Sequence, residues 1–186
     1  MAIKVLKGQE IDITKNNPGL KKIKITLGWN LNEKEKKKYD FDSSVFLCNE
    51  KGKAISNKHF VFYNNRFDPS GAVTHLGDNK TGEEGEEEII ILLEKIPIEV
   101  CKLVFAVSIH EGEKKNQNFG QVESSCLKIL DGESNEELIR FDLKNEFSSE
   151  TGIIIGEMCK KNEEWKFKTK GIGFPEGLKG ILMYHK

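Results

Sequence analysis

Acidic side chains are concentrated in the stretch from Thr74 to Glu88, THLGDNKTGEEGEEE. It contains a Gly-Asp-Asn turn and a Thr-Gly turn, and its last six residues, from Glu83 onward, include five carboxylates. Two like charges ~4 Å apart repel by about 1 kcal/mol in water and by roughly 4 kcal/mol near a protein surface. Such a segment either stays extended in solvent or closes around a cation.

Glycines favour closure around a cation, because they allow φ > 0 and a close approach of the backbone. The stretch carries them at Gly77, Gly82 and Gly85. Carboxylates, amide oxygens and backbone carbonyls are the hard ligands that Ca²⁺ takes. For an acidic run taken alone, a solvated loop is the alternative interpretation.

A second acidic pair precedes the apolar run Val45 to Cys48. Asp40 and Asp42 alternate with two aromatic residues there, and the two-residue period of a strand places both acids on one face. Two acids on one face cost stability unless a positive charge lies nearby. The EF-hand pattern is absent, because Ser44 stands at the third ligand position and no glycine follows it. A calcium site would therefore be assembled from two segments distant in sequence.

Several motifs follow one another along nearly the whole chain. They are Leu27 to Asn30 (LGWN), Tyr39 to Ser44 (YDFDSS), Phe60 to Asn65 (FVFYNN), Gly71 to Gly82 (GAVTHLGDNKTG), Phe119 to Val122 (FGQV) and Glu164 to Phe167 (EWKF). In content and order they resemble the motifs of the TerD family, the tellurium-resistance and general stress proteins that bind calcium. The resemblance implies a single TerD-like domain over residues 1–186.

The resemblance also implies a set of Ca²⁺ ligands, carried over position by position. They are Asp40, Asp42, Asp78, Asn79, Gly82, Glu83, Glu86, Glu87 and Glu88, with Asn30 in place of a family aspartate and Glu111 at a position that is usually acidic. Asn30 keeps a carbonyl ligand but loses a charge, and the acidic loop is one residue shorter than in the family. Fewer charges weaken Ca²⁺ affinity, so these two departures affect the affinity and the number of ions.

Composition excludes several classes of protein. The 29 basic and 30 acidic residues nearly cancel, so no global field attracts nucleic acid. The longest purely aliphatic run, Ile89 to Leu93, is far too short to cross a bilayer, and the first residues lack the apolar core of a signal peptide. We therefore expect a cytoplasmic protein without a transmembrane segment. Its four cysteines form no CxxC pair, which argues against a zinc site and against disulfides.

Short alternating segments separated by turns predict an all-β fold. Lys22 to Leu27 alternates cleanly, Cys101 to Ile109 lines one face with apolar residues, and Ile89 to Leu93 is typical of a strand covered on both faces. Gln121 to Leu130 and Glu137 to Leu143 are predicted to form a hairpin. We expect a β-sandwich of two mainly antiparallel sheets with short helical segments, and calcium loops gathered at one end.

Two functions remain open at this stage. The resemblance implies a non-catalytic calcium-binding stress module that recruits other tellurium-resistance or stress proteins, membrane-associated partners among them. The alternative is a hydrolase that uses the same clustered carboxylates as acid, base or metal ligands. Acids crowded into one loop do not easily reach opposite faces of a sugar ring, and no nucleophile with a base partner lies within sequence reach. The first function is therefore preferred, and we expect no enzymatic activity.

Overall fold

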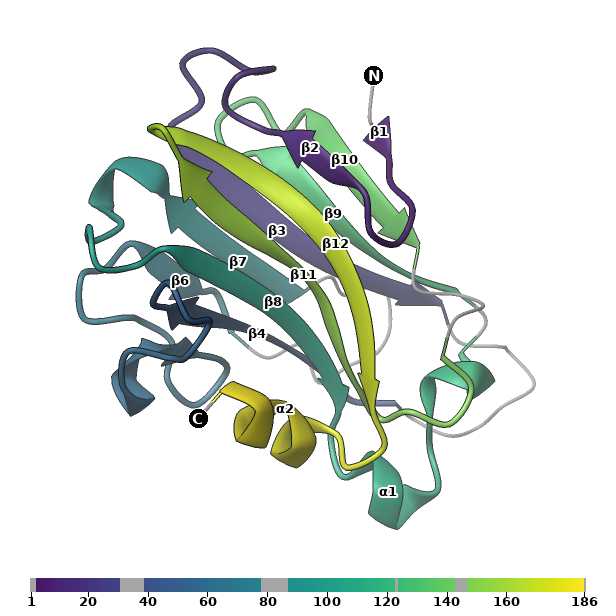
Figure 1. The fold of residues 1–186 in the computed structure, drawn as a ribbon. Helices are drawn as coiled ribbons and strands as arrows, with labels where there is room; N and C mark the ends of the chain where they lie inside the picture. The colour runs from purple at the N-terminus through teal and green to yellow at the C-terminus, as the bar shows by residue number, and fades with distance from the viewer. Residues whose placement is uncertain (1–2, 31–38, 78–86, 123, 143–146, 186) are drawn as a thin grey trace.

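Two six-stranded sheets packed face to face make up the fold (Figure 1). The structure, a computed structural model, describes residues 3–30, 39–77, 87–122, 124–142 and 147–185. The predicted all-β fold of two mainly antiparallel sheets with short helices is confirmed.

The first sheet has β3 near its centre. Its strands, in spatial order, are β1 (Ile3–Lys4), β10 (Glu137–Asp142), β9 (Ser124–Asp131), β3 (Lys22–Asn30), β7 (Glu87–Leu92) and β6 (Val73–His75). β1 pairs with β10 in parallel, and the other neighbours are antiparallel. The predicted hairpin is present as β9 and β10.

The second sheet is built from the remaining strands. In spatial order they are β2 (Glu10–Asp12), β12 (Glu164–Phe174), β11 (Gly152–Lys161), β8 (Lys102–Ile109), β4 (Phe41–Cys48) and β5 (Phe60–Val61), all antiparallel to their neighbours. Consecutive strands stand at the edges of both sheets: β1 and β2 at one side, and β5 and β6 at the other.

Alternating apolar residues fill the space between the sheets. Ile23, Ile25 and Leu27 of β3 point inward as their spacing predicts, and Val45 and Leu47 of β4 face them from the second sheet. β7 differs from its prediction, because Ile89 and Ile91 are buried while Ile90 and Leu92 are only half-buried. The outer face of the first sheet is thus less covered than the continuous apolar run of β7 suggests.

The outer face of the second sheet is partly covered by α2 (Leu178–His185), which packs on β8 and β11 (Figure 1). A second apolar cluster lies beneath it and includes Phe46, Cys48 and Ile181. The remaining helices are single turns: η1 (Asn57–His59), η2 (Leu93–Lys95), α1 (Gly112–Lys115) and η3 (Phe119–Gln121). Across the described part of the chain, no helix has the length and apolar character needed to cross a bilayer.

The strand directions place the end of β3, the starts of β4 and β7, and the end of β8 at one end of the sandwich. Leu27, near the end of β3, pairs with Glu87 at the start of β7. Phe41, at the start of β4, pairs with Ile109 at the end of β8. The segments that carry the predicted ligands therefore start or finish at the same end of the fold.

Candidate metal centre

The start of β4 and the start of β7 meet across the two sheets. The backbone N–H of Ser43 donates a hydrogen bond to Oε2 of Glu87, with 2.5 Å between the two atoms, although the residues are 44 apart in sequence. Ser43 faces the inner core because it shares its strand face with Val45, whereas Asp42 faces outward with Phe46. The hydrogen bond between Ser43 and Glu87 thus joins the start of β4, which follows Asp40, to the start of β7, which follows residues 78–86.

Glu87 is a carboxylate enclosed between the sheets. It is 1% exposed, and its Oε1 has no hydrogen-bond partner among the described residues. Within the same part of the chain, no lysine or arginine pairs with it; the neighbouring basic group is the imidazole of His75, with Nε2 3.5 Å from Oε2. A buried charge without a cation costs several kcal/mol. Glu87 therefore has a carboxylate oxygen that could still coordinate a cation, and it directly follows residues 78–86, called the acidic segment below.

His75 stands on the other side of that segment and is fully buried. The backbone N–H of Gly77 donates to its Nδ1 at 3.1 Å, so we assign the ring proton to Nε2. Nε2 lies 3.3 Å from Ser43 Oγ. The ring therefore presents a neutral N–H to Ser43 and Glu87, and it does not supply the positive charge that Glu87 lacks.

The backbone at the end of β6 is held from outside by Arg66. Its Nε donates to the carbonyl of His75 at 3.0 Å, and its second guanidinium nitrogen donates to the carbonyl of Leu76 at 2.6 Å. Gly77 then adopts φ 126°, a left-handed conformation that disfavours other residues. On the β7 side, the N–H of Leu76 donates to the carbonyl of Glu88. The base of the acidic segment is thus fixed by hydrogen bonds.

Asp40 and Asp42 lie beside the end of β8. Asp42 is 6% exposed, and its Oδ2 is 3.4 Å from Nδ1 of His110. The backbone N–H of His110 also donates to the carbonyl of Asp40, which precedes β4 and is half-buried. Tyr39 and Phe41 turn to the core, where their rings stack 5.8 Å apart. The predicted separation of acids from aromatics is confirmed at this point.

Glu88 and Glu111 point in other directions. Glu88 is on the outer face of the first sheet, 3.3 Å from Lys24. Glu111 precedes α1 with φ 54° and pairs with Lys114 at 2.9 Å, which lowers the pKa of its carboxyl. Both carboxylates have a lysine partner, whereas Glu87 has none within the described chain.

The other predicted ligands lie outside the described residues. They are Asp78, Asn79, Gly82, Glu83 and Glu86, together with the side chain of Asn30, whose backbone ends β3. Among the residues that are described, no group of three or more His, Cys, Asp or Glu side chains could hold a metal ion. A cation centre at this end would draw ligands from residues 78–86 as well as from Glu87.

Ser43, His75 and Glu87 do not form a nucleophilic triad. In such a triad the carboxylate and the hydroxyl bind different ring nitrogens, but here both face Nε2 while Nδ1 accepts from Gly77. All three side chains are also closed off from solvent. The arrangement holds two segments together and offers no access to a substrate.

Comparison with known proteins gives the family. The TerD domain description matches residues 1–185. The chain belongs to the TerD family. General stress protein 16U of Bacillus subtilis is 45% identical over 184 residues, covering 97% of this chain and 95% of the relative. Tellurium resistance protein TerD of Serratia marcescens is 36% identical, covering 97% of this chain and 95% of that protein.

Solved structures share the TerD fold. A homologue of telluride resistance protein (TerD) from Streptomyces coelicolor A3(2) superposes with a TM-score of 0.70 at 18% identity, over 90% of this chain and 97% of that one. The family resemblance inferred from motifs is confirmed, and so is the fold it implied. The relatives cited above are named for stress or resistance and carry no enzyme name.

Sequence reasoning overlooked Ser43 and His75 in this TerD chain. Neither residue belongs to the ligand set that the family resemblance implies, and Ser43 was noted only as part of the motif from Tyr39 to Ser44. A usable signal was present, because Val73 and His75 are two residues apart in a short apolar strand and therefore share its buried face. A buried histidine immediately before an acidic loop is a feature that sequence alone can flag.

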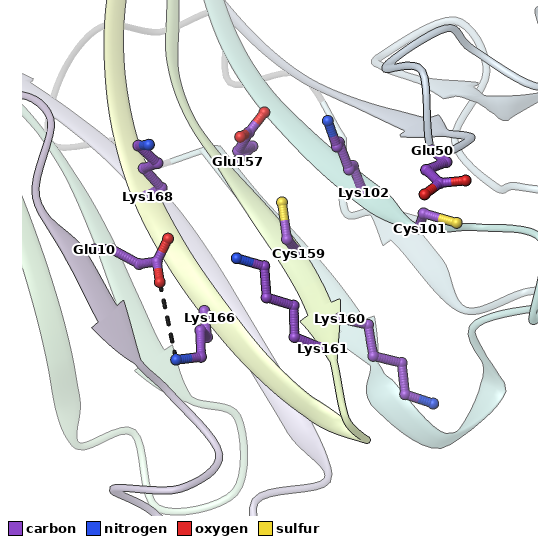
Figure 2. A pocket seen from close by; sticks show the side chains of 10 residues that line it. All are labelled: Glu10, Glu50, Cys101, Lys102, Glu157, Cys159, Lys160, Lys161, Lys166 and Lys168. Carbon is purple, nitrogen blue, oxygen red and sulfur yellow. Dashed lines mark ion pairs between the residues drawn. The ribbon is translucent and has the colours of Figure 1, made fainter.

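A separate depression of about 320 Å³ lies on the outer face of the second sheet (Figure 2). It is lined by Glu10, Glu50, Cys101, Lys102, Glu157, Cys159, Lys160, Lys161, Lys166 and Lys168. Glu10 and Asp12 pair with Lys166, and Glu157 pairs with Lys170. Burial and the neighbouring Glu157 raise the pKa of the Cys159 thiol, so the cysteine is not an activated nucleophile. We assign no site to this surface.

Proposed function

We propose that this protein is a calcium-binding, non-catalytic stress-response module of the TerD type. Its Ca²⁺ ligands would come from residues 78–86 and from Glu87, with Asp40 and Asp42 contributing from the start of β4. In this role the protein would recruit other tellurium-resistance or stress proteins. Bound calcium would supply the positive charge that the clustered acids require.

Glu87 is the observation that carries the proposal. Its carboxylate is buried, no lysine or arginine in the described chain pairs with it, and Oε1 has no hydrogen-bond partner there. Such an oxygen is stable when it coordinates a cation or when it is protonated. Because Glu83, Glu86 and Asp78 precede it within ten residues, a shared divalent cation is the simpler source of compensation.

The donor chemistry favours calcium over a transition metal. The candidate ligands are carboxylates, an amide and backbone carbonyls, which are hard oxygen donors suited to Ca²⁺. The histidines nearby are already engaged: His75 accepts from Gly77, and His110 lies against Asp42. Cys48 lies at the far end of β4, and Cys101 and Cys159 line the depression on the outer face of the second sheet.

A non-catalytic role is supported by two observations. Close relatives are named for tellurium resistance and general stress. The Ser43, His75 and Glu87 cluster, which contains the types of residue found in hydrolase triads, is enclosed and has the wrong bonding pattern. Turnover of esters or glycosides by the purified protein would overturn this part of the proposal.

Calorimetric titration with Ca²⁺ tests the site directly. We expect the wild-type protein to bind, and Asp78→Ala and Asp42→Ala each to weaken affinity at least about tenfold, because each removes a charged ligand. Glu94→Gln is the matched control, since Glu94 is an exposed carboxylate beyond the other end of β7. Binding that survives both alanine substitutions would remove the proposed site.

A melting curve in calcium and in chelator checks the same proposal by linkage. At 100 times its dissociation constant, a ligand that binds only the folded state adds about 2.7 kcal/mol, which raises Tm by roughly 5–10 °C in a chain of this size. The two alanine variants should lose most of this rise, and the Glu94→Gln control should retain it.

A further inference from the structure

The imidazole of His75 contacts the two residues that flank the acidic segment, Gly77 and Glu87. The segment from residue 78 to residue 86 begins directly after Gly77 and ends directly before Glu87. Gly77 donates its N–H to Nδ1 of His75, and Glu87 places Oε2 3.5 Å from Nε2 of the same ring. The ring is fully buried, so its position is set by the packing between the two sheets.

The two ring nitrogens have different tasks. Nδ1 accepts from the backbone before the segment, and Nε2–H faces the carboxylate after it. Ser43 completes the arrangement from the second sheet, because its N–H donates to Oε2 and its Oγ lies 3.3 Å from Nε2. Oε2 is therefore held by Ser43 and lies against His75, and Oε1 is left without a partner in the described chain.

We propose that His75 is a positioning residue for the cation centre: it fixes the separation of the two ends of the acidic segment and orients Glu87 so that Oε1 is available as a ligand. The inference rests on the proposed calcium-binding function. No contact between His75 and the ion is required, since the histidine would act through Gly77 and Glu87.

The physical basis is pre-organisation. A loop whose ends are already fixed loses less conformational entropy when a cation gathers its ligands. A carboxylate whose second oxygen is already hydrogen-bonded also needs less reorientation before it coordinates. Partners of metal ligands typically change affinity by roughly 10–100-fold when removed, even though they do not touch the metal.

Two substitutions at His75 separate the two tasks of the ring. His75→Asn keeps an acceptor near the position of Nδ1 and removes the N–H that faces Ser43 and Glu87. His75→Gln keeps an N–H donor near the position of Nε2 and removes the acceptor for Gly77. We expect each variant to weaken Ca²⁺ binding by roughly 10–100-fold in calorimetric titration.

His185→Asn provides the matched control. His185 is also a buried histidine, but it packs on the opposite face of β4, against Phe46 and Cys48. This variant should lower the melting temperature and leave the calcium dissociation constant within about twofold of wild type, because the two sites share no partner. Ser43→Ala, which removes only the hydroxyl that faces Nε2, is a milder variant if the His75 substitutions prevent folding, and it should weaken calcium binding without abolishing it.

The outcomes distinguish the two proposals. Wild-type protein that binds no calcium overturns the proposed function and this inference with it. Wild-type protein that binds calcium, with His75 and Ser43 variants that bind it equally well, overturns the inference alone. A loss of affinity in the His75 variants that His185→Asn does not share supports a positioning role, because loss of core stability alone would affect all three variants.

Discussion

Glu87 and Glu88 are neighbours in sequence with opposite environments. Strand alternation turns Glu87 into the space between the sheets and Glu88 outward to Lys24. The family resemblance implied both as ligands, because the family motif has a run of acids at these positions. The difference between them depends on the register of β7, which the acidic run itself does not reveal. The sequence could therefore predict the acidic region, but not which carboxylate is enclosed.

Because the Glu87 carboxylate is enclosed, we expect the effect of Glu87→Gln on the free energy of unfolding to change sign between chelator and calcium. In chelator, Glu87→Gln should be more stable than wild type by roughly 1–3 kcal/mol, because it removes a buried charge while keeping an acceptor for Ser43. In saturating calcium the variant should be less stable than wild type, because a ligand is lost. Urea unfolding under both conditions measures this.

Glu88→Gln is the comparison, and it should change stability by less than about 0.5 kcal/mol in chelator, as expected at a half-exposed position. If Glu87→Gln is destabilised in chelator, the protein itself compensates the charge and the argument from Glu87 is wrong.

Individual strands were predicted better than the pairing of strands within the sheets. The alternation of Lys22 to Leu27 and of Leu103 to Ile109 placed β3 and β8 and their buried faces correctly. The position of β3 between β7 and β9 was not predictable, because those strands are far away in sequence and pairing depends on the whole sheet. The C-terminal stretch forms α2, and its last residue, His185, is held by a hydrogen bond from Nδ1 to the carbonyl of Gly52.

His185 makes the docking of α2 sensitive to pH. Burial lowers the pKa of its ring below the ordinary 6.5, and the charge of Lys53 lowers it further. The hydrogen bond to the Gly52 carbonyl and the carboxylate of Glu157 raise the pKa, but by less. The ring also lies beside Cys48, whose thiol pKa burial raises to about 12. The unfolded chain therefore takes up a proton at higher pH than the native state, and the free energy of unfolding falls as pH drops below about 6.5.

His185→Asn should reduce this pH dependence, because asparagine can still donate to Gly52 but does not titrate. The check is urea unfolding of both proteins at pH 7.5 and pH 5.5. We expect the wild type to lose more stability than the variant between these values; equal losses would show that His185 is not the group that responds.

At the scale of the molecule, the segment from Ile3 to Ile13 connects the two sheets along one side. β1 extends the first sheet, β2 extends the second, and the buried residues Val5 and Ile13 follow each of them into the core. The backbone N–H of Val5 donates to Arg140, and that of Ile13 donates to Trp165. This arrangement could not be predicted, since two- and three-residue strands carry almost no periodicity.

Deletion of residues 1–13 should destabilise the protein and promote self-association. Burial of the two apolar side chains contributes roughly 1.5–3 kcal/mol each, and the deletion exposes β10 and β12 as open edges. Urea unfolding and light scattering measure the two effects. Leu6→Ser, at a residue that is 69% exposed, should leave both properties near wild type. A truncated protein that stays monomeric and equally stable would contradict the prediction.

The opposite side of the sandwich is crossed in the same manner by the chain that runs from β5 to β6, where Phe67 also bridges to Thr74. Within the described chain, the edge strands of both sheets are therefore only two or three residues long, and such short edges offer few free backbone donors and acceptors for a strand of another protein. A partner of the kind proposed above would instead recognise side chains, on the broad outer surfaces or at the end of the sandwich where β4 and β7 begin.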